Sequence, residues 1–177
     1  MGYIDELGTA AKAAEREMTK IGTMQKNAAL RAVSEKLLSN KDVIIKENGR
    51  DIENARINGM SEAMIDRLTL TESRIDGISE GVLQVVALKD PIGEVIGGGE
   101  LPNGLRIIQK RVPLGVIGII FESRPNVTVD AAALCLKSGN VCILRGGSDA
   151  IYSNKCLVKL MREAISEAGL PADAVQL

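Results

Sequence analysis

The sequence has no histidine and no tryptophan, and its aromatic residues are limited to Tyr3, Phe121 and Tyr152. Without histidine, the common zinc ligand sets are not available. So few aromatic side chains do not make a stacking platform for single-stranded nucleic acid. The formal net charge of −1 also gives no broad basic field for DNA or RNA. We therefore expect no metal and no nucleic-acid partner.

Long hydrophobic runs are missing as well. The longest apolar stretches are far shorter than a membrane span, and nothing in the charge balance suggests an anionic membrane surface. The N-terminal segment, MGYIDELGTAAKAAEREM, has early acidic residues and no apolar core of the kind found in a secretory signal. We expect a cytoplasmic protein with no membrane partner.

Cysteine is scarce, with only Cys135, Cys142 and Cys156 in the chain. An odd number without paired spacing argues against a disulfide framework. All three lie within apolar patterns, two in expected helices and one in an expected strand. We interpret them as small core residues rather than nucleophiles.

The residues that are present describe an ordinary globular chain, with 45% apolar and 25% charged residues in a length of 177. Residues 1–92 are predicted to be helical. Apolar residues recur at helical spacing in 24–38, with Thr23 as a candidate N-cap, and again in 72–88. Residues 41–58 show a weaker pattern, with Gly49 as an interruption.

Residues 93–112 favour a two-stranded arm. Two β-like runs, 94–96 and 105–112, flank a turn rich in Gly, Pro and Asn. The Gly97–Gly98–Gly99 segment is not followed by a helix and lacks the spacing of a phosphate loop, so we interpret it as a flexible part of the hairpin.

Residues 113–177 alternate between apolar strands and helices. LGVIGIIF, VCILR and AVQL are predicted strands, separated by helices over about 128–137 and from 151 onward. Continuous apolar strands are typical of a parallel sheet that is covered on both faces. The chain is thus predicted to be α/β: N-terminal helices, a two-stranded arm, and the first β-α-β-α-β of a Rossmann-like sheet. Since the pattern stops inside a strand, we expect an incomplete domain of a longer protein.

Polar residues follow the first two strands of this sheet, where ligands bind in open α/β folds. In FESRPN, Pro125 forces Arg124 out of the helical region, and Arg124 can grip a carboxylate or phosphate. A local ion pair between Glu122 and Arg124 is the alternative. In RGGSDA, Arg145 suits the 2′-phosphate of NADP, or is simply a surface arginine. Two glycines would let ligand and backbone approach closely, and Ser148 or Asp149 is expected to cap the next helix.

The segment RVPLGVIGIIFESRPNVTVDAAALCLKSGNVCILRGGSDA closely resembles the γ-glutamyl phosphate reductases, a family within the aldehyde dehydrogenase superfamily. The similarity extends over the whole chain, including MQKNAALRAVSEKLL, MIDRLTLTESRI and LKDPIGEVIGGGELPNGLRI. It implies the second step of proline biosynthesis, in which NADPH reduces L-glutamyl 5-phosphate to L-glutamate 5-semialdehyde with release of phosphate. It also implies a homo-oligomer formed through the arm.

The resemblance assigns provisional roles to residues at the strand ends. The substrate or oxyanion set is Ser123, Arg124 and Asn126, and the cofactor-binding set is Phe121, Glu122, Arg145, Gly146, Gly147 and Ser148. The family's nucleophilic cysteine would lie beyond residue 177, so this chain would hold no catalytic residue and would be inactive alone. The alternatives are a non-catalytic nucleotide-binding or interaction module, and a superfamily member that uses another aldehyde and NAD.

Overall fold

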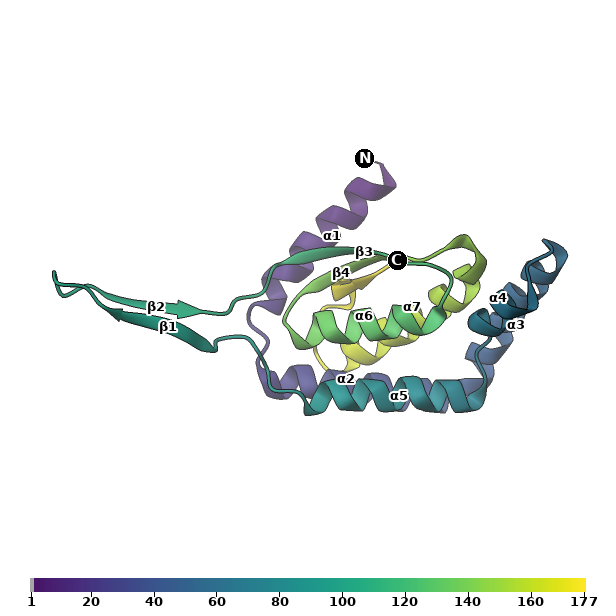
Figure 1. Ribbon diagram of the computed structural model, residues 1–177, viewed down its shortest axis with the longest axis horizontal. Helices are drawn as coiled ribbons and strands as arrows, with labels where there is room; N and C mark the ends of the chain where they lie inside the picture. Colours follow the sequence, from purple (N-terminus) through teal and green to yellow (C-terminus); the bar gives the residue numbers. More distant parts are fainter. Residues whose placement is uncertain (1) are drawn as a thin grey trace.

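The computed structural model describes residues 2–177 (Figure 1). Its α-helices are α1 (Tyr3–Met18), α2 (Thr23–Ser39), α3 (Lys41–Ile57), α4 (Glu62–Leu68), α5 (Glu72–Ala87), α6 (Pro125–Lys137) and α7 (Ile151–Glu167). Its strands are β1 (Val95–Glu100), β2 (Arg106–Lys110), β3 (Val116–Ile120), β4 (Val141–Arg145) and β5 (Val175–Gln176). Two short 3-10 helices, η1 (Ser148–Ala150) and η2 (Ala172–Ala174), precede α7 and β5.

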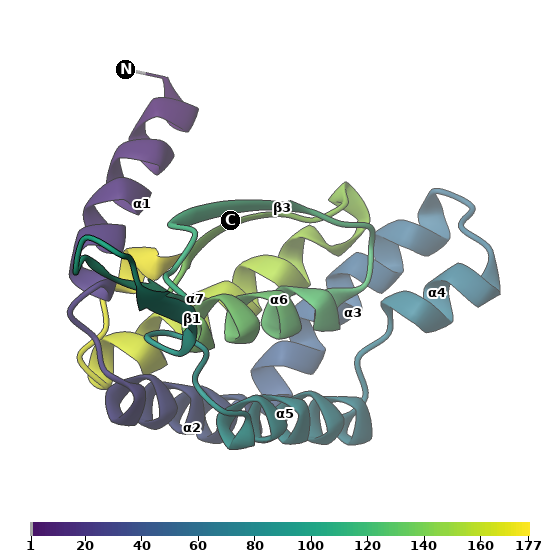
Figure 2. The same cartoon turned by 60° about the vertical axis from the view of Figure 1, so that its left-hand side comes forward.

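The body is built in layers. Strands β3, β4 and β5 form a parallel sheet in that order. Helices α6 and α7 pack against one face of the sheet, and α2 and α5 form a further layer behind them (Figures 1 and 2). The antiparallel pair β1–β2 projects from the body (Figure 1). The predicted α/β fold class, with helices first and a parallel sheet last, is confirmed.

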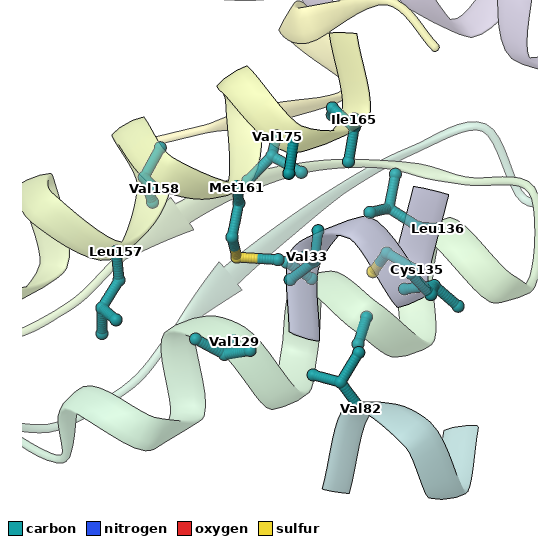
Figure 3. Packing of buried hydrophobic residues seen from close by; sticks show 14 of the residues in the cluster. Val33, Val82, Val129, Cys135, Leu136, Leu157, Val158, Met161, Ile165 and Val175 are labelled. Atoms are coloured by element: carbon teal, nitrogen blue, oxygen red, sulfur yellow. The ribbon is translucent and has the colours of Figure 1, made fainter. Parts of the chain in front are cut away.

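The main hydrophobic core lies between the sheet and the helical layers. Figure 3 shows side chains from α2, α5, α6, α7 and β5 meeting there, among them Val33, Val82, Leu136, Met161 and Val175. Leu136 and Met161 have no exposed surface, and burying such a side chain fully contributes roughly 1.5–3 kcal/mol. This core fixes the position of the strand ends.

Helix α2 begins one residue earlier than the predicted cap allows. Thr23 is the first helical residue and Gly22 is the N-cap, so the prediction of Thr23 as N-cap is wrong. The Thr23 hydroxyl instead donates a hydrogen bond of 2.6 Å to Asp90, which also pairs with the buried Lys26. Burial alone would raise the pKa of Asp90, but the hydrogen bonds from Lys26 and Thr23 outweigh it and lower that pKa.

Helix α3 is continuous through Gly49, so the predicted interruption is wrong. A glycine inside a helix costs about 0.5–1 kcal/mol relative to alanine. The adjacent Asn48 makes buried hydrogen bonds that offset this cost. Its side-chain nitrogen donates to the Leu68 carbonyl (2.9 Å), and its side-chain oxygen accepts from the Leu70 backbone amide (2.7 Å). These bonds join α3 to the segment between α4 and α5.

The three glycines of the arm lie in strand β1 and not in the turn, which corrects the prediction. Gly98 has a φ of +147°, and a Cβ atom there would collide with the Ile107 carbonyl oxygen of β2. The pairing is irregular between Val95 and Gly97. Glycine therefore allows the two strands to approach each other.

Helix α6 starts at Pro125, three residues before the predicted start at Thr128. Proline is favourable in the first helical position because its missing N–H would have no helical partner there. Arg124 is the N-cap, with extended φ and ψ of −100° and 106°. The expectation that Pro125 keeps Arg124 out of the helix is confirmed.

The sheet is not covered on both faces within residues 2–177, contrary to the prediction from its apolar strands. Ile117 and Ile119 of β3 pack against the core, whereas Ile120 is 86% exposed. Helix α1 contacts the strands but does not cover Ile120 at the carboxyl end of β3. None of the described helices is long and apolar enough to cross a membrane.

Candidate functional site at the strand ends

The loops that follow β3 and β4 meet at one edge of the sheet. Ile120 lies opposite Arg145 in the parallel register, so the residues after them share that edge. The Phe121 amide donates to the Arg145 carbonyl (3.0 Å), and the Gly147 amide donates to the Glu122 carbonyl (3.4 Å). We call residues 121–124 and 146–149 the rim loops.

The two glycines of the rim are required by contacts within the protein. A Cβ atom on Gly146 would collide with the Asn154 amide nitrogen and lie 3.0 Å from the Phe121 ring. A Cβ atom on Gly147 would lie 2.8 Å from the Ser123 hydroxyl oxygen. The glycines therefore allow the backbone of one rim loop to lie close to Phe121, Ser123 and Asn154, and the close approach of a ligand at the same glycines stays a prediction.

Ser123 is half-buried and donates its hydroxyl hydrogen to the Asp149 carboxylate, at 2.9 Å. A serine hydroxyl has one hydrogen to donate. In this arrangement the hydrogen is already used, so Ser123 could stabilise an oxyanion only after leaving Asp149. Asp149 was not predicted as a partner of Ser123, since 26 residues separate the two.

The cap of α7 comes from a distant helix. Its N-cap residue is Ala150, which makes no side-chain cap bond, so the prediction of Ser148 or Asp149 as the cap is wrong. The buried Asp51 carboxylate of α3 accepts from the amides of Tyr152 (3.1 Å) and Ser153 (2.8 Å) and from the Ser153 hydroxyl (2.6 Å). Ser148 and Asp149 lie in the 3-10 helix η1, before the N-cap position of α7.

Arg145 projects from the end of β4 into a cavity of about 500 Å³ between α1 and the start of α7. Its guanidinium donates to the Gly146 carbonyl at 3.2 Å, and no carboxylate lies within ion-pairing distance of it in the described part of the chain. Asn154 lines the same cavity. Its side-chain oxygen accepts from Thr128 (2.8 Å), but its buried side-chain nitrogen has no partner among residues 2–177.

Arg124 lies on the other side of the rim. No ion pair between Glu122 and Arg124 occurs within residues 2–177, so the local ion pair is not formed. Arg124 lines two cavities of about 410 and 370 Å³, and Arg67 of α4 lines both as well. The smaller one also includes Glu122, Ser123 and Gly147.

Asn126, in the first turn of α6, donates its side-chain amide to Asp130 at 3.0 Å. Asp130 is half-buried, and burial raises the pKa of its carboxyl group above the usual range, with the Asn126 hydrogen bond opposing this effect. Both residues line the 410 Å³ cavity. Sequence reasoning missed Asp130, although its spacing of four residues from Asn126 places the two on one face of a helix. Arg67 gave no local signal.

The three cysteines are free. Cys135 and Cys142 are buried, as predicted, whereas Cys156 is only half-buried. A hydrogen bond with Cys135 and burial raise the pKa of the Cys142 thiol, and burial raises the pKa of Cys156. Raised pKa values keep these two groups protonated and therefore poor nucleophiles.

The parallel sheet, its polar edge and the helices behind it define an α/β protein of the kind that binds ligands at the carboxyl ends of its strands. The model of the aldehyde dehydrogenase family matches residues 3–177. This chain belongs to the aldehyde dehydrogenase family, in which a nicotinamide cofactor is expected.

Similar proteins narrow the relationship. The chain is 55% identical over 170 residues to the gamma-glutamyl phosphate reductase of Clostridium botulinum (strain Alaska E43 / Type E3), a match that covers 96% of this chain and 41% of the relative. It is similar to the crystal structure of gamma-glutamyl phosphate reductase from Thermotoga maritima, with a TM-score of 0.96 and 43% identity over 99% of this chain and 42% of that chain. The corresponding Saccharomyces cerevisiae structure gives a TM-score of 0.92 and 31% identity, over 100% of this chain and 46% of that one. The resemblance predicted from the sequence motifs is confirmed, and the chain spans about two-fifths of the length of these relatives.

Proposed function

We propose that this chain is part of an NADPH-dependent reductase that converts L-glutamyl 5-phosphate to L-glutamate 5-semialdehyde and phosphate in proline biosynthesis. The observation that carries the proposal is the 55% identity to a relative named for this reaction over nearly all of the chain. The strand ends agree with it, because Arg145 and Arg124 lie on the two sides of the rim and neither has a carboxylate partner within residues 2–177. An anionic substrate and a phosphorylated cofactor both need such groups.

The cofactor side would be the cavity that contains Arg145. A guanidinium with no carboxylate partner and a buried Asn154 amide with no acceptor both line it, so the residues present fit a ligand rich in oxygen atoms. When bound, the nicotinamide cofactor would supply the hydride. Arg145 would bind the 2′-phosphate, with Gly146, Gly147 and Ser148 providing backbone and hydroxyl groups beside it. Phe121 and Glu122 would support this loop from the β3 side.

The substrate side would be formed by Ser123, Arg124 and Asn126. Arg124 would bind an anionic group of the substrate and hold the molecule at the rim. The buried or protonated thiols of Cys135, Cys142 and Cys156 do not suit nucleophilic attack, so we propose that the nucleophilic cysteine lies in a part of the protein outside residues 1–177. The chain alone would then be inactive.

The arm would serve assembly. Nearly all residues of its two strands are exposed, among them Ile107 at 48% and Ile108 at 62%, and a lone two-stranded hairpin is only marginally stable in water. We propose that residues 93–112 form the interface of a homo-oligomer. In this division of the chain, residues 1–92 are the helical part and residues 113–177 are the start of the cofactor domain. Free thiols fit a reducing compartment, and we propose the cytoplasm.

The experiment that tests this function uses the full-length protein and measures NADP-dependent oxidation of glutamate 5-semialdehyde in the presence and absence of phosphate, which is the reaction in reverse. Phosphate-dependent turnover is expected. Replacing Arg145 with Ala should raise the KM for NADP+ at least tenfold and leave the KM for NAD+ nearly unchanged, because a charged hydrogen-bonded contact contributes about 1.5–3 kcal/mol. Arg16→Ala, an exposed arginine on α1, is the matched control. Equal effects on both cofactors would refute the role of Arg145, and turnover that does not depend on phosphate would refute the reaction.

A further inference from the structure

The 410 Å³ cavity between α4, α5 and the start of α6 contains charges of both signs that do not neutralise one another. Arg67, Arg124 and Asp130 line it. None of the three takes part in an ion pair within residues 2–177. We call Arg67, Arg124, Asn126 and Asp130 the head-group set.

The other charged residues of this cavity are already paired. Arg74 donates to the Asp66 side chain at 2.9 Å and to the Thr69 carbonyl at 2.8 Å. These contacts tie the end of α4 to the start of α5 and make Arg74 and Asp66 part of the wall. The head-group set is therefore what remains available to a ligand.

Each unpaired charge favours a particular partner. Asp130 is half-buried and is held only by Asn126, at 3.0 Å, so a cation beside it would offset the cost of its burial. Arg67 and Arg124 carry like charges at one cavity, and an anion between them would relieve their repulsion. The first turn of α6 lies beside Arg124 and also favours an anion. A ligand with adjacent ammonium and carboxylate groups satisfies all three side chains.

A second cavity shares two lining residues with the first. Arg67 and Arg124 line both cavities, and the second one reaches Ser123 and Gly147 at the rim. A substrate whose charged head lies in the 410 Å³ cavity can therefore extend its reacting end to the carboxyl ends of the strands. The combined space is of the size that small-molecule sites in proteins have.

We infer that the head-group set binds the α-amino-acid end of the substrate, with Arg67 and Arg124 on its carboxylate and Asp130, positioned by Asn126, on its ammonium group. This assignment rests on the proposed reductase function and deepens it, because it gives the protein a means to select an amino-acid aldehyde over simple aldehydes. Arg67, Asn126 and Asp130 act in specificity and positioning and not in the chemical step.

The test compares substrates that lack one group at a time. In the full-length enzyme, the reverse reaction is measured with glutamate 5-semialdehyde, with 5-oxopentanoate, which lacks the ammonium group, and with 4-aminobutanal, which lacks the carboxylate. Asp130→Asn should lower kcat/KM for glutamate 5-semialdehyde at least tenfold and leave that for 5-oxopentanoate within about twofold, since one charged contact is worth roughly that factor. Arg67→Gln should lower kcat/KM for both carboxylate substrates and not for 4-aminobutanal.

Arg16→Gln on α1 is the matched control and should behave as wild type with every substrate. If Asp130→Asn or Arg67→Gln lowers kcat/KM by the same factor for all three aldehydes, or changes none, the inference is overturned. If Asp130→Asn does not fold, the Arg67→Gln substrate series decides in the same way. A wrong proposed function would give a different result from a wrong head-group assignment, because the wild-type enzyme would then show no phosphate-dependent turnover of glutamate 5-semialdehyde.

Discussion

The buried carboxylate of Asp51 should be one of the most sensitive positions in the chain. It is 1% exposed and accepts three hydrogen bonds from the first turn of α7. Replacing it with Ala removes a helix cap, which costs about 1 kcal/mol. It also leaves buried donors without an acceptor, at about 1–3 kcal/mol each where no other partner can be found. The Ser153 hydroxyl oxygen accepts from the Asn48 amide, so this contact gives the hydroxyl hydrogen no new acceptor. We therefore expect Asp51→Ala to lower the free energy of unfolding by about 3–5 kcal/mol.

The isosteric variant separates charge from hydrogen bonding. Asp51→Asn retains one acceptor oxygen and loses the negative charge at the helix N-terminus, so we expect a loss of about 1–2 kcal/mol. Urea unfolding of the chain followed by circular dichroism gives both values. Glu53→Gln, an exposed carboxylate on the same helix, should change the free energy by less than about 0.5 kcal/mol. An Asp51→Ala variant as stable as Glu53→Gln would refute the view that Asp51 holds the start of α7.

Three further outcomes follow from particular contacts. Gly147→Ala should lower kcat/KM of the full-length enzyme for both NADP+ and glutamate 5-semialdehyde, because the new methyl group meets the Ser123 hydroxyl oxygen at 2.8 Å. Gly49→Ala, at an open helical position, is the control, and unchanged kinetics of Gly147→Ala would contradict the contact. Burial raises the pKa of Asp130 above 3.8, so its contribution to stability is most favourable below the unfolded pKa and declines as pH rises through the folded pKa. Asp130→Asn should therefore have a higher free energy of unfolding than wild type at pH 7, and urea unfolding at a series of pH values should not show this decline for the variant. A variant less stable than wild type at pH 7 would contradict the prediction. Ile108→Lys on the arm should dissociate the oligomer in sedimentation experiments, whereas Lys110→Glu on the same strand should perturb it less, and an unchanged sedimentation coefficient for Ile108→Lys would exclude this face as the interface.

The elements of the parallel sheet could be predicted because each carries its own local signal. VCILR is a short apolar run bounded by Asn140 and Gly146, and the structure has β4 at Val141–Arg145. Pro125 marked the change from strand to helix, because proline restricts the residue before it. The same apolar runs predicted that helices cover both faces of the sheet, and this prediction was wrong for β3. The sequence of an apolar strand does not show which other elements pack against its two faces.

Contacts between distant residues could not be predicted in this way. Thr23 has the character of a cap, but Asp90, 67 residues away, takes its hydroxyl. The amides at the start of α7 are bound by Asp51, which lies 101 residues from Tyr152 and 102 from Ser153. Arg67 is one of the exposed charged residues of the short helix α4, and only the folded chain brings it to the same cavities as Arg124. The sequence therefore pointed to the strand ends as the candidate site and gave no signal for Arg67, which lines cavities beside them.

The rim loops divide the site into two sides, each of which has its own arginine side chains. Arg145 lines a cavity with α1 and α7, whereas Arg67 and Arg124 line cavities with α4 and α6. Between the two sides, the Gly147 amide donates a hydrogen bond to the Glu122 carbonyl, and the Ser123 hydroxyl donates one to the Asp149 carboxylate. Because Gly147 has no side chain, its backbone can lie close to the Ser123 hydroxyl oxygen. Under the proposed function, a cofactor at Arg145 and a substrate at Arg124 would meet at the rim, and this would account for the polar residues Glu122, Ser123 and Arg124 at the end of an apolar strand.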